Sequence, residues 1–146
     1  MRKIIIILLL FTLISCKTNH DYKIWFLTPP CITPHEKYRY YTCSDMEVLI
    51  NDSELTIPKH FETDLASIPR FYWAFMTPSN SDFMGPSILH DYLYRCTSIY
   101  TRIESDNIFY YALRDRDVSV YTSYKMYIAV RLFGAGNFDP KGSCGD

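Results

Sequence analysis

The residues best suited to chemistry lie in the segment HDYLYR, at positions 90–95 of this 146-residue chain. If the segment is helical, His90 and Tyr94 share one face, because residues four apart lie one turn above each other. Asp91 and Arg95 then share the neighbouring face. An imidazole held rigidly beside a carboxylate and a phenol is the arrangement that a general base needs.

A second polar segment, TDLASIPR, precedes HDYLYR in the chain. It contributes Asp64, Ser67 and Arg70, and Pro69 indicates a turn. We expect Asp64 to approach His90 from this loop.

A third segment, ESDNIF, supplies Asp106. Thr101 and Glu104 form a capping-box pattern, which begins a helix shortly after HDYLYR. Because the turn between the two helices is short, they should pack antiparallel. This arrangement predicts that His90, Tyr94 and Asp106 are in contact.

The same residues also have a purely structural explanation. His90 and Asp106 would form a buried polar pair that fixes the packing of two helices without performing chemistry. Asp91 and Arg95 would form a surface ion pair of small energetic value. Asp64 would satisfy backbone amides in its turn. The sequence leaves both explanations open.

The N-terminus has the layout of a secretory leader. Arg2 and Lys3 precede an apolar run at residues 4–14, which is short for a membrane span. The run ends in LISC, which resembles the lipobox of bacterial lipoproteins. The resemblance implies a signal peptide at residues 1–15 and a diacylated Cys16. Lys17 follows Cys16. In bacterial lipoproteins an aspartate at this position favours retention in the inner membrane, so we expect this protein at the periplasmic face of the outer membrane.

The rest of the chain is long enough for one domain with one core. Its composition, 48% apolar and 16% aromatic, is typical of a folded domain. A net charge of −1 and the lack of a basic run after the leader exclude nucleic acid as an expected partner.

Four of the five cysteines lie beyond Cys16, and an even number in an exported chain indicates two disulfides. Three pairings are open. We favour Cys31 with Cys43, because both lie in the N-terminal segment, which leaves Cys96, at a helix end, to hold the tail at Cys144. Zinc is the less favoured alternative, because no CxxC pair is present.

The remaining patterns predict an α+β domain. Residues 16–37 carry three prolines and no periodicity, and we expect a lipidated tether and irregular cover there. Residues 38–42, 46–50 and 54–57 are rich in strand formers and indicate a small antiparallel sheet.

Three helices are expected in the C-terminal half. The first runs from about Pro86 to Arg95, the second starts after Thr101, and the third lies between Ser119 and Gly134. We therefore predict one domain at residues 38–134, with the sheet packed on the three helices and supported by disulfides, and a tail at residues 135–146.

Four separated blocks of the chain resemble a family found largely in phage and prophage genomes, the domain of unknown function 1353. The blocks are IPKHFETDLASIPRFYW, ILHDYLYR, DNIF and MYIAVRLFG, and they span residues 57–134. The family name carries no activity. The resemblance implies the domain type and a phage or prophage setting.

A weaker resemblance concerns HDxxY, which is similar to the motif of phospholipase A2 enzymes. It implies that His90 deprotonates a water and that Asp91 holds calcium. It also implies that Asp106 orients the imidazole, with Tyr94 as a supporting donor. Those enzymes wrap calcium in a glycine-rich loop, but residues 70–74 here, RFYWA, contain no glycine.

Calcium prefers six to eight oxygen ligands, so another loop would have to contribute, with Asp64 and Ser67, or Asp82 near Gly85, as the candidates. Two functions are therefore expected. The first is a lipid-anchored phage or prophage lipoprotein that acts on an envelope protein, in envelope modification or in exclusion of competing phage. The second is a His90-dependent hydrolase of phospholipid or another envelope ester.

Overall fold

A computed structural model of the chain describes residues 21–65 and 81–144. Cys16, Ser67 and Arg70 lie outside these ranges. The strands form two three-stranded antiparallel sheets, in the orders β1-β4-β5 and β2-β3-β6. The strands are β1 (Ile24–Phe26), β2 (Ile32–Glu36), β3 (Arg39–Thr42), β4 (Met46–Ile50), β5 (Ser53–Ile57) and β6 (Glu62–Thr63).

The α+β class is confirmed, with two corrections in the N-terminal half. There are two small sheets, and the segment expected to be irregular supplies an edge strand to each of them, β1 and β2. Ile24 is 3% exposed and anchors β1 in the core. Pro34 lies in β2 beside a register shift, and an edge strand with an irregularity is where a sheet tolerates proline.

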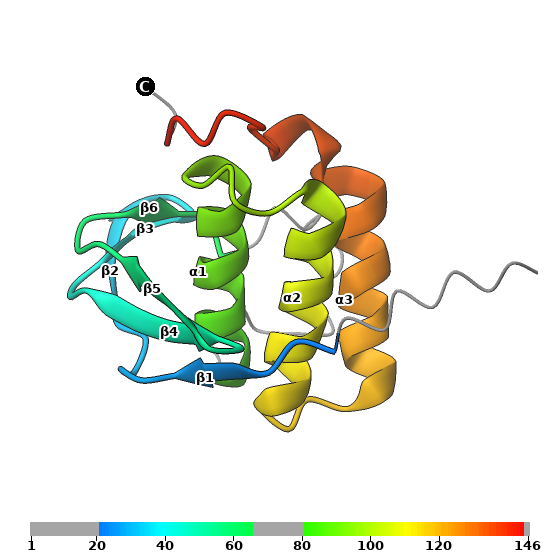
Figure 1. Ribbon diagram of the computed structural model, residues 1–146. Helices are drawn as coiled ribbons and strands as arrows, with labels where there is room; N and C mark the ends of the chain where they lie inside the picture. The colour runs from blue at the N-terminus through cyan, green and yellow to red at the C-terminus, as the bar shows by residue number, and fades with distance from the viewer. Residues whose placement is uncertain (1–20, 66–80, 145–146) are drawn as a thin grey trace, which may run out of the picture.

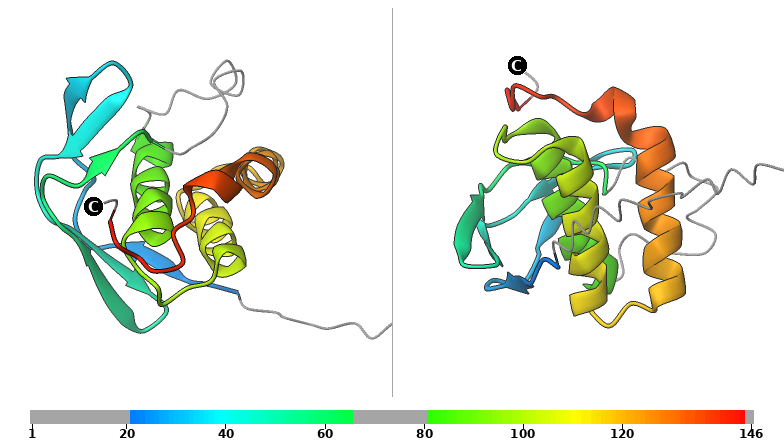
Figure 2. Two further views of the ribbon diagram at one scale, coloured as in Figure 1. Left: turned by 90° about the horizontal axis from the view of Figure 1, so that it is seen from above. Right: turned by 45° about the vertical axis from the view of Figure 1, so that its right-hand side comes forward.

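Three helices form the C-terminal half: α1 (Ser81–Arg95), α2 (Arg102–Asp115) and α3 (Val120–Phe133). The sheets lie on one side of α1, and α2 and α3 follow on the other side (Figure 1). Seen from above, the three helices stand side by side (Figure 2). Among the described residues, no helix is both long and apolar enough to cross a bilayer.

Helix α1 begins earlier than expected. Pro86 was predicted at its first turn but lies inside the helix, five residues after Ser81. A proline there removes one backbone hydrogen bond. The candidate residues His90, Asp91, Tyr94 and Arg95 lie in the second half of α1.

The ends of α2 and α3 follow the predicted signals. Thr101 accepts a hydrogen bond from the Glu104 amide, and the Glu104 carboxylate accepts one from the Thr101 amide, which completes the capping box. Ser119 caps the start of α3, and Gly134 ends it.

Apolar residues of α2 face two ways. Ile108 and Ala112 belong to a core shared with α1 and the strands, whereas Phe109 and Leu113 belong to a second core shared with α3. A short 3₁₀ helix, η2 (Gly134–Asn137), leads into the tail. The tail is held to the end of α1, because the Asp139 amide donates to the Tyr94 carbonyl at 2.8 Å.

Candidate functional site

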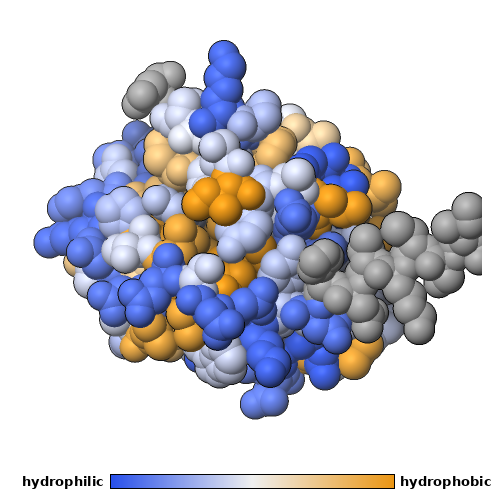
Figure 3. Space-filling model, in the orientation of Figure 1, coloured by the Kyte–Doolittle hydropathy of each residue, from blue (hydrophilic) through white to orange (hydrophobic). Residues whose placement is uncertain are grey.

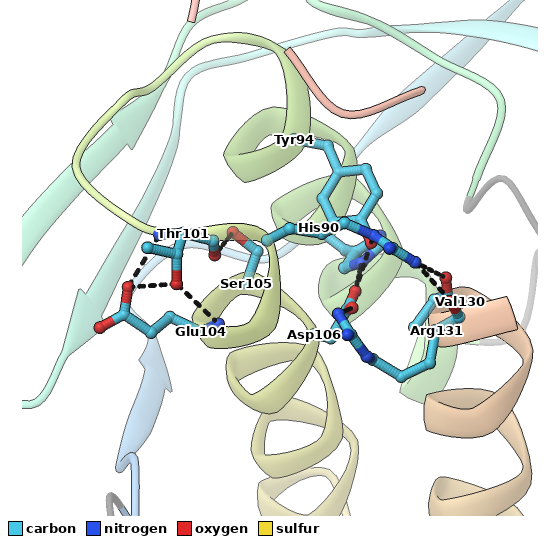
Figure 4. A network of polar contacts seen from close by, with 9 residues as sticks. His90, Tyr94, Thr101, Glu104, Ser105, Asp106, Val130 and Arg131 are labelled. Atoms are coloured by element: carbon cyan, nitrogen blue, oxygen red, sulfur yellow. Dashed lines mark hydrogen bonds and ion pairs between the residues drawn. The ribbon is translucent and has the colours of Figure 1, made fainter. Parts of the chain in front are cut away.

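The candidate site is a buried polar network between the three helices (Figure 4). Helix α1 presents His90 and Tyr94, one turn apart, toward Asp106 of α2. Helix α3 adds Arg131 from the other side. The predicted contact between His90, Tyr94 and Asp106 is therefore present.

Asp106 is the centre of the network. Its Oδ1 lies 2.9 Å from His90 Nε2 and accepts the Tyr94 hydroxyl at 2.5 Å. Its Oδ2 accepts from Arg131 Nη1 at 2.7 Å. Both carboxylate oxygens are thus occupied by donors from two different helices.

Arg102 joins the network to the C-terminal end of α3. Its Nε donates to the Tyr94 hydroxyl at 3.3 Å. Its Nη2 donates to the carbonyls of Val130, at 3.2 Å, and Arg131. A guanidinium is well placed there, because the last carbonyls of a helix lack helical partners and carry partial negative charge.

Electrostatics favour the ionised carboxylate. Burial by itself raises the pKa of Asp106, but hydrogen bonds and charge from His90, with further hydrogen bonds from Tyr94 and Arg131, bring that pKa below its ordinary value. Burial and then the Asp106 hydrogen bond raise the pKa of the Tyr94 phenol. The hydrogen bond to Asp106 also raises the pKa of Arg131. The network therefore holds an anion, a neutral phenol and a guanidinium.

One atom of the network has no partner. His90 Nδ1 is buried and makes no hydrogen bond to the part of the chain that the structure describes. An imidazole held by a carboxylate on one nitrogen and free on the other has the form of a general base. However, the side chains of His90 and Asp106 are both 0% exposed, so no ester bond reaches that nitrogen in this conformation.

Asp91 lies on the sheet side of α1, where β6 approaches. Thr63 donates its hydroxyl to Asp91 Oδ2 at 2.5 Å, and the same hydroxyl oxygen accepts from the Leu65 amide at 3.0 Å. Asp91 is 3% exposed. The expected surface pair of Asp91 with Arg95 is not among the ion pairs of residues 21–65 and 81–144, since Arg95 donates to the Glu62 carbonyl.

Asp64 does not belong to the buried network around His90, because the His90 side chain is fully buried and Asp64 lies on the surface. Its neighbour Thr63 points inward, and side chains alternate along an extended chain, so Asp64 is exposed. Asp64 lines a pocket of about 150 Å³ together with Glu62, Arg95 and two other residues, Arg39 and Asn137. The guanidinium carbon of Arg95, Cζ, also lies 4.8 Å from the centre of the Phe61 ring.

Asp91 and Asp64 therefore do not fit a shared calcium ion. The first carboxylate is buried against Thr63, and the second faces a surface pocket. The described residues contain no group of three or more His, Cys, Asp or Glu side chains with metal-binding geometry. Calcium's six to eight oxygens would have to come from groups other than these.

Both favoured cysteine pairs are at disulfide distance. Cys31, just before β2, pairs with Cys43, just after β3, and their Cα atoms are 5.4 Å apart. Cys96 pairs with Cys144 and ties the tail to the end of α1.

Sequence reasoning missed Arg131, Arg102 and Thr63 as members of these networks. A signal for Arg131 was present, because it is the only charged residue in the apolar run MYIAVRLF. Thr63 had no comparable signal, since a threonine beside a turn has many uses.

Comparison with known proteins identifies a family and nothing further. No curated protein and no solved structure matches the chain. Residues 41–130 match a family described as a protein of unknown function, DUF1353. The matched range contains His90, Asp91, Tyr94 and Asp106. Because the match covers more than half of the chain, this protein belongs to the DUF1353 family.

Proposed function

We propose that the chain is an exported lipoprotein of a phage or prophage, anchored through Cys16 at the periplasmic face of the outer membrane. The observation that carries the proposal is the pairing of all four described cysteines. Disulfides persist in oxidising compartments and are rare in the cytosol. This pairing agrees with the export that the leader and LISC predict.

The lipoprotein acts by contact, in exclusion of competing phage or in envelope modification. The sealed network supports this mode, because His90, Asp106 and Tyr94 are between 0% and 1% exposed and join helices. Such a network stabilises a rigid surface without presenting a reactive group. The partner is a protein of the envelope.

The test is phage adsorption to Gram-negative cells that express the full-length protein. We expect slower adsorption and fewer plaques for some tailed phages in a panel. The Cys16→Ser variant should be neither acylated nor retained in the outer membrane, and it should restore infection. Normal infection by every phage, together with an unaltered envelope composition, would count against the proposal.

A second function is favoured by one observation, the unpartnered Nδ1 of His90. Because Asp106 contacts Nε2, Nδ1 would be the nitrogen that accepts a proton from water. This would require the helices to separate enough to admit phospholipid. Hydrolysis of micellar phospholipid, with calcium and with a chelator, tests it. Activity that is lost in His90→Ala but kept in His35→Ala, on the exposed strand β2, would establish the hydrolase.

A further inference from the structure

A continuous row of tyrosine rings crosses α2 and α3. Ring centroids lie 5.2 Å apart between Tyr111 and Tyr110, and 6.2 Å apart between Tyr110 and Tyr127. Tyr127 stacks on Tyr124 at 6.2 Å. Tyr22 joins the other end, 6.3 Å from Tyr111. We call these five residues the tyrosine row.

The row reaches solvent at its α3 end. Tyr124 is 57% exposed, and Tyr121, one turn earlier, is 69% exposed. The ammonium of Lys125 lies 4.2 Å from the centre of the Tyr121 ring. Val120 and Leu132, also on α3, are 58% and 67% exposed.

The other end of the row lies where the described chain begins. The Tyr111 hydroxyl donates to Asp21 Oδ1 at 2.6 Å, and Asp21 is the first described residue. Figure 1 shows the chain entering β1 across the lower half of α2. Five peptide units separate Asp21 from Cys16, so the chain can span at most about 18 Å between them.

An anchor at Cys16 would therefore hold this side of the domain beside the bilayer. Tyrosine suits that position, because its ring is apolar and its hydroxyl stays hydrated, and it is enriched at membrane interfaces. Helix α3 carries the exposed Lys125 and no acidic residue, which suits a negatively charged lipid surface. The charge of Arg131, also on α3, is paired with buried Asp106. Figure 3 shows the side of the molecule seen in Figure 1, where apolar side chains are interspersed with polar ones.

We propose that Tyr110, Tyr111, Tyr124 and Tyr127 of the tyrosine row, together with the exposed face of α3, lie on the headgroup region of the bilayer to which Cys16 is attached. Tyr22, which is 8% exposed, supports the row from the core. The inference rests on the proposed lipidation. It also sets the orientation of the domain, because β2 and β3 lie on the far side of α1 from α3 (Figure 2). The second sheet would then face the periplasm, where a partner binds.

The test uses the acylated mature protein, which begins at Cys16, in vesicles of phosphatidylethanolamine and phosphatidylglycerol that contain a photoactivatable phospholipid. After irradiation, reduction and tryptic digestion, mass spectrometry locates the lipid adducts. We expect them on residues 117–125, which contain Tyr121 and Tyr124. Residues 40–59, from the far sheets, also contain two tyrosines, Tyr40 and Tyr41, and should stay unlabelled.

Two variants sharpen the result. Tyr124→Asp places a negative charge on the exposed face and should lower labelling of residues 117–125 severalfold. Thr33→Asp adds the same charge to the exposed strand β2 and should leave labelling unchanged. Both sites are exposed, so both variants should fold, which circular dichroism checks.

The intact mass separates the two possible failures. A protein without the diacyl group would overturn the proposed anchoring, and this inference with it. An acylated protein whose label falls on residues 40–59, or equally on both peptides, would overturn the orientation alone.

Discussion

The Tyr94 ring lies directly against Gly134, so that a Cβ atom on Gly134 would stand 3.0 Å from the Tyr94 hydroxyl and 3.1 Å from Cε2. Tyr94 cannot yield easily, because its hydroxyl is bonded to Asp106 and Arg102. The backbone itself does not require glycine, since φ at Gly134 is −78°. The close packing of α3 on the end of α1 is what excludes a side chain.

Gly134→Ala should therefore lower the free energy of unfolding by about 1–3 kcal/mol through overpacking. Gly136→Ala is the matched control, because nothing lies within 4 Å of a Cβ there. Urea denaturation measures both. Equal stability of the two variants would show that Tyr94 moves aside freely.

Asp106→Asn should destabilise the domain by about 1–3 kcal/mol, because it weakens the hydrogen bonds of three buried or half-buried donors. The structural role predicts a lower melting temperature. A catalytic role predicts that phospholipid hydrolysis is lost while the melting temperature is kept. Full stability together with full biological activity would remove both roles.

Stability should also fall in acid because of Asp106. Its pKa in the folded chain is below the ordinary value of 3.8, so the unfolded chain takes up the proton first. The stabilisation that ionised Asp106 provides is present above the unfolded pKa of 3.8 and is lost as the pH falls through the lower pKa of the folded chain. The difference in stability between wild type and Asp106→Asn should shrink between about pH 7 and about pH 3. A difference that widens in acid would contradict this sign.

The two disulfides should contribute unequally. Cys96 and Cys144 are separated by 48 positions in the sequence, and Cys31 and Cys43 by 12. Loop entropy predicts about 4 and about 3 kcal/mol respectively. Denaturant unfolding of Cys→Ser pairs measures the difference. Thiol titration of denatured, unreduced protein should find no free thiol among these four residues, and four thiols would refute the bonds.

Thr63→Val should cost about 1–3 kcal/mol, because it keeps the side-chain volume but removes the hydroxyl donor of buried Asp91. Thr33→Val, on the exposed strand β2, is the control and should change stability by less than about 0.5 kcal/mol. Thermal unfolding compares the two. A similar small effect for both would mean that Asp91 does not depend on Thr63.

The sequence by itself determined the features that depend on neighbouring residues. Thr101 and Glu104 marked the start of α2, and Ser119 and Gly134 marked the ends of α3, because capping uses groups within one helical turn. The spacing of His90 and Tyr94 with the short turn before α2 predicted their contact with Asp106. The four blocks indicated the family.

Only the tertiary structure decided the features that depend on distant residues. It brought Arg131 to Asp106, turned Thr63 inward in place of Asp64, and divided the strands into two sheets. It also enclosed His90 completely. These outcomes follow from how helices and strands far apart in the chain pack together, and local patterns do not encode that packing. The burial of a side chain, above all, depends on the assembled core and cannot be read from its own segment.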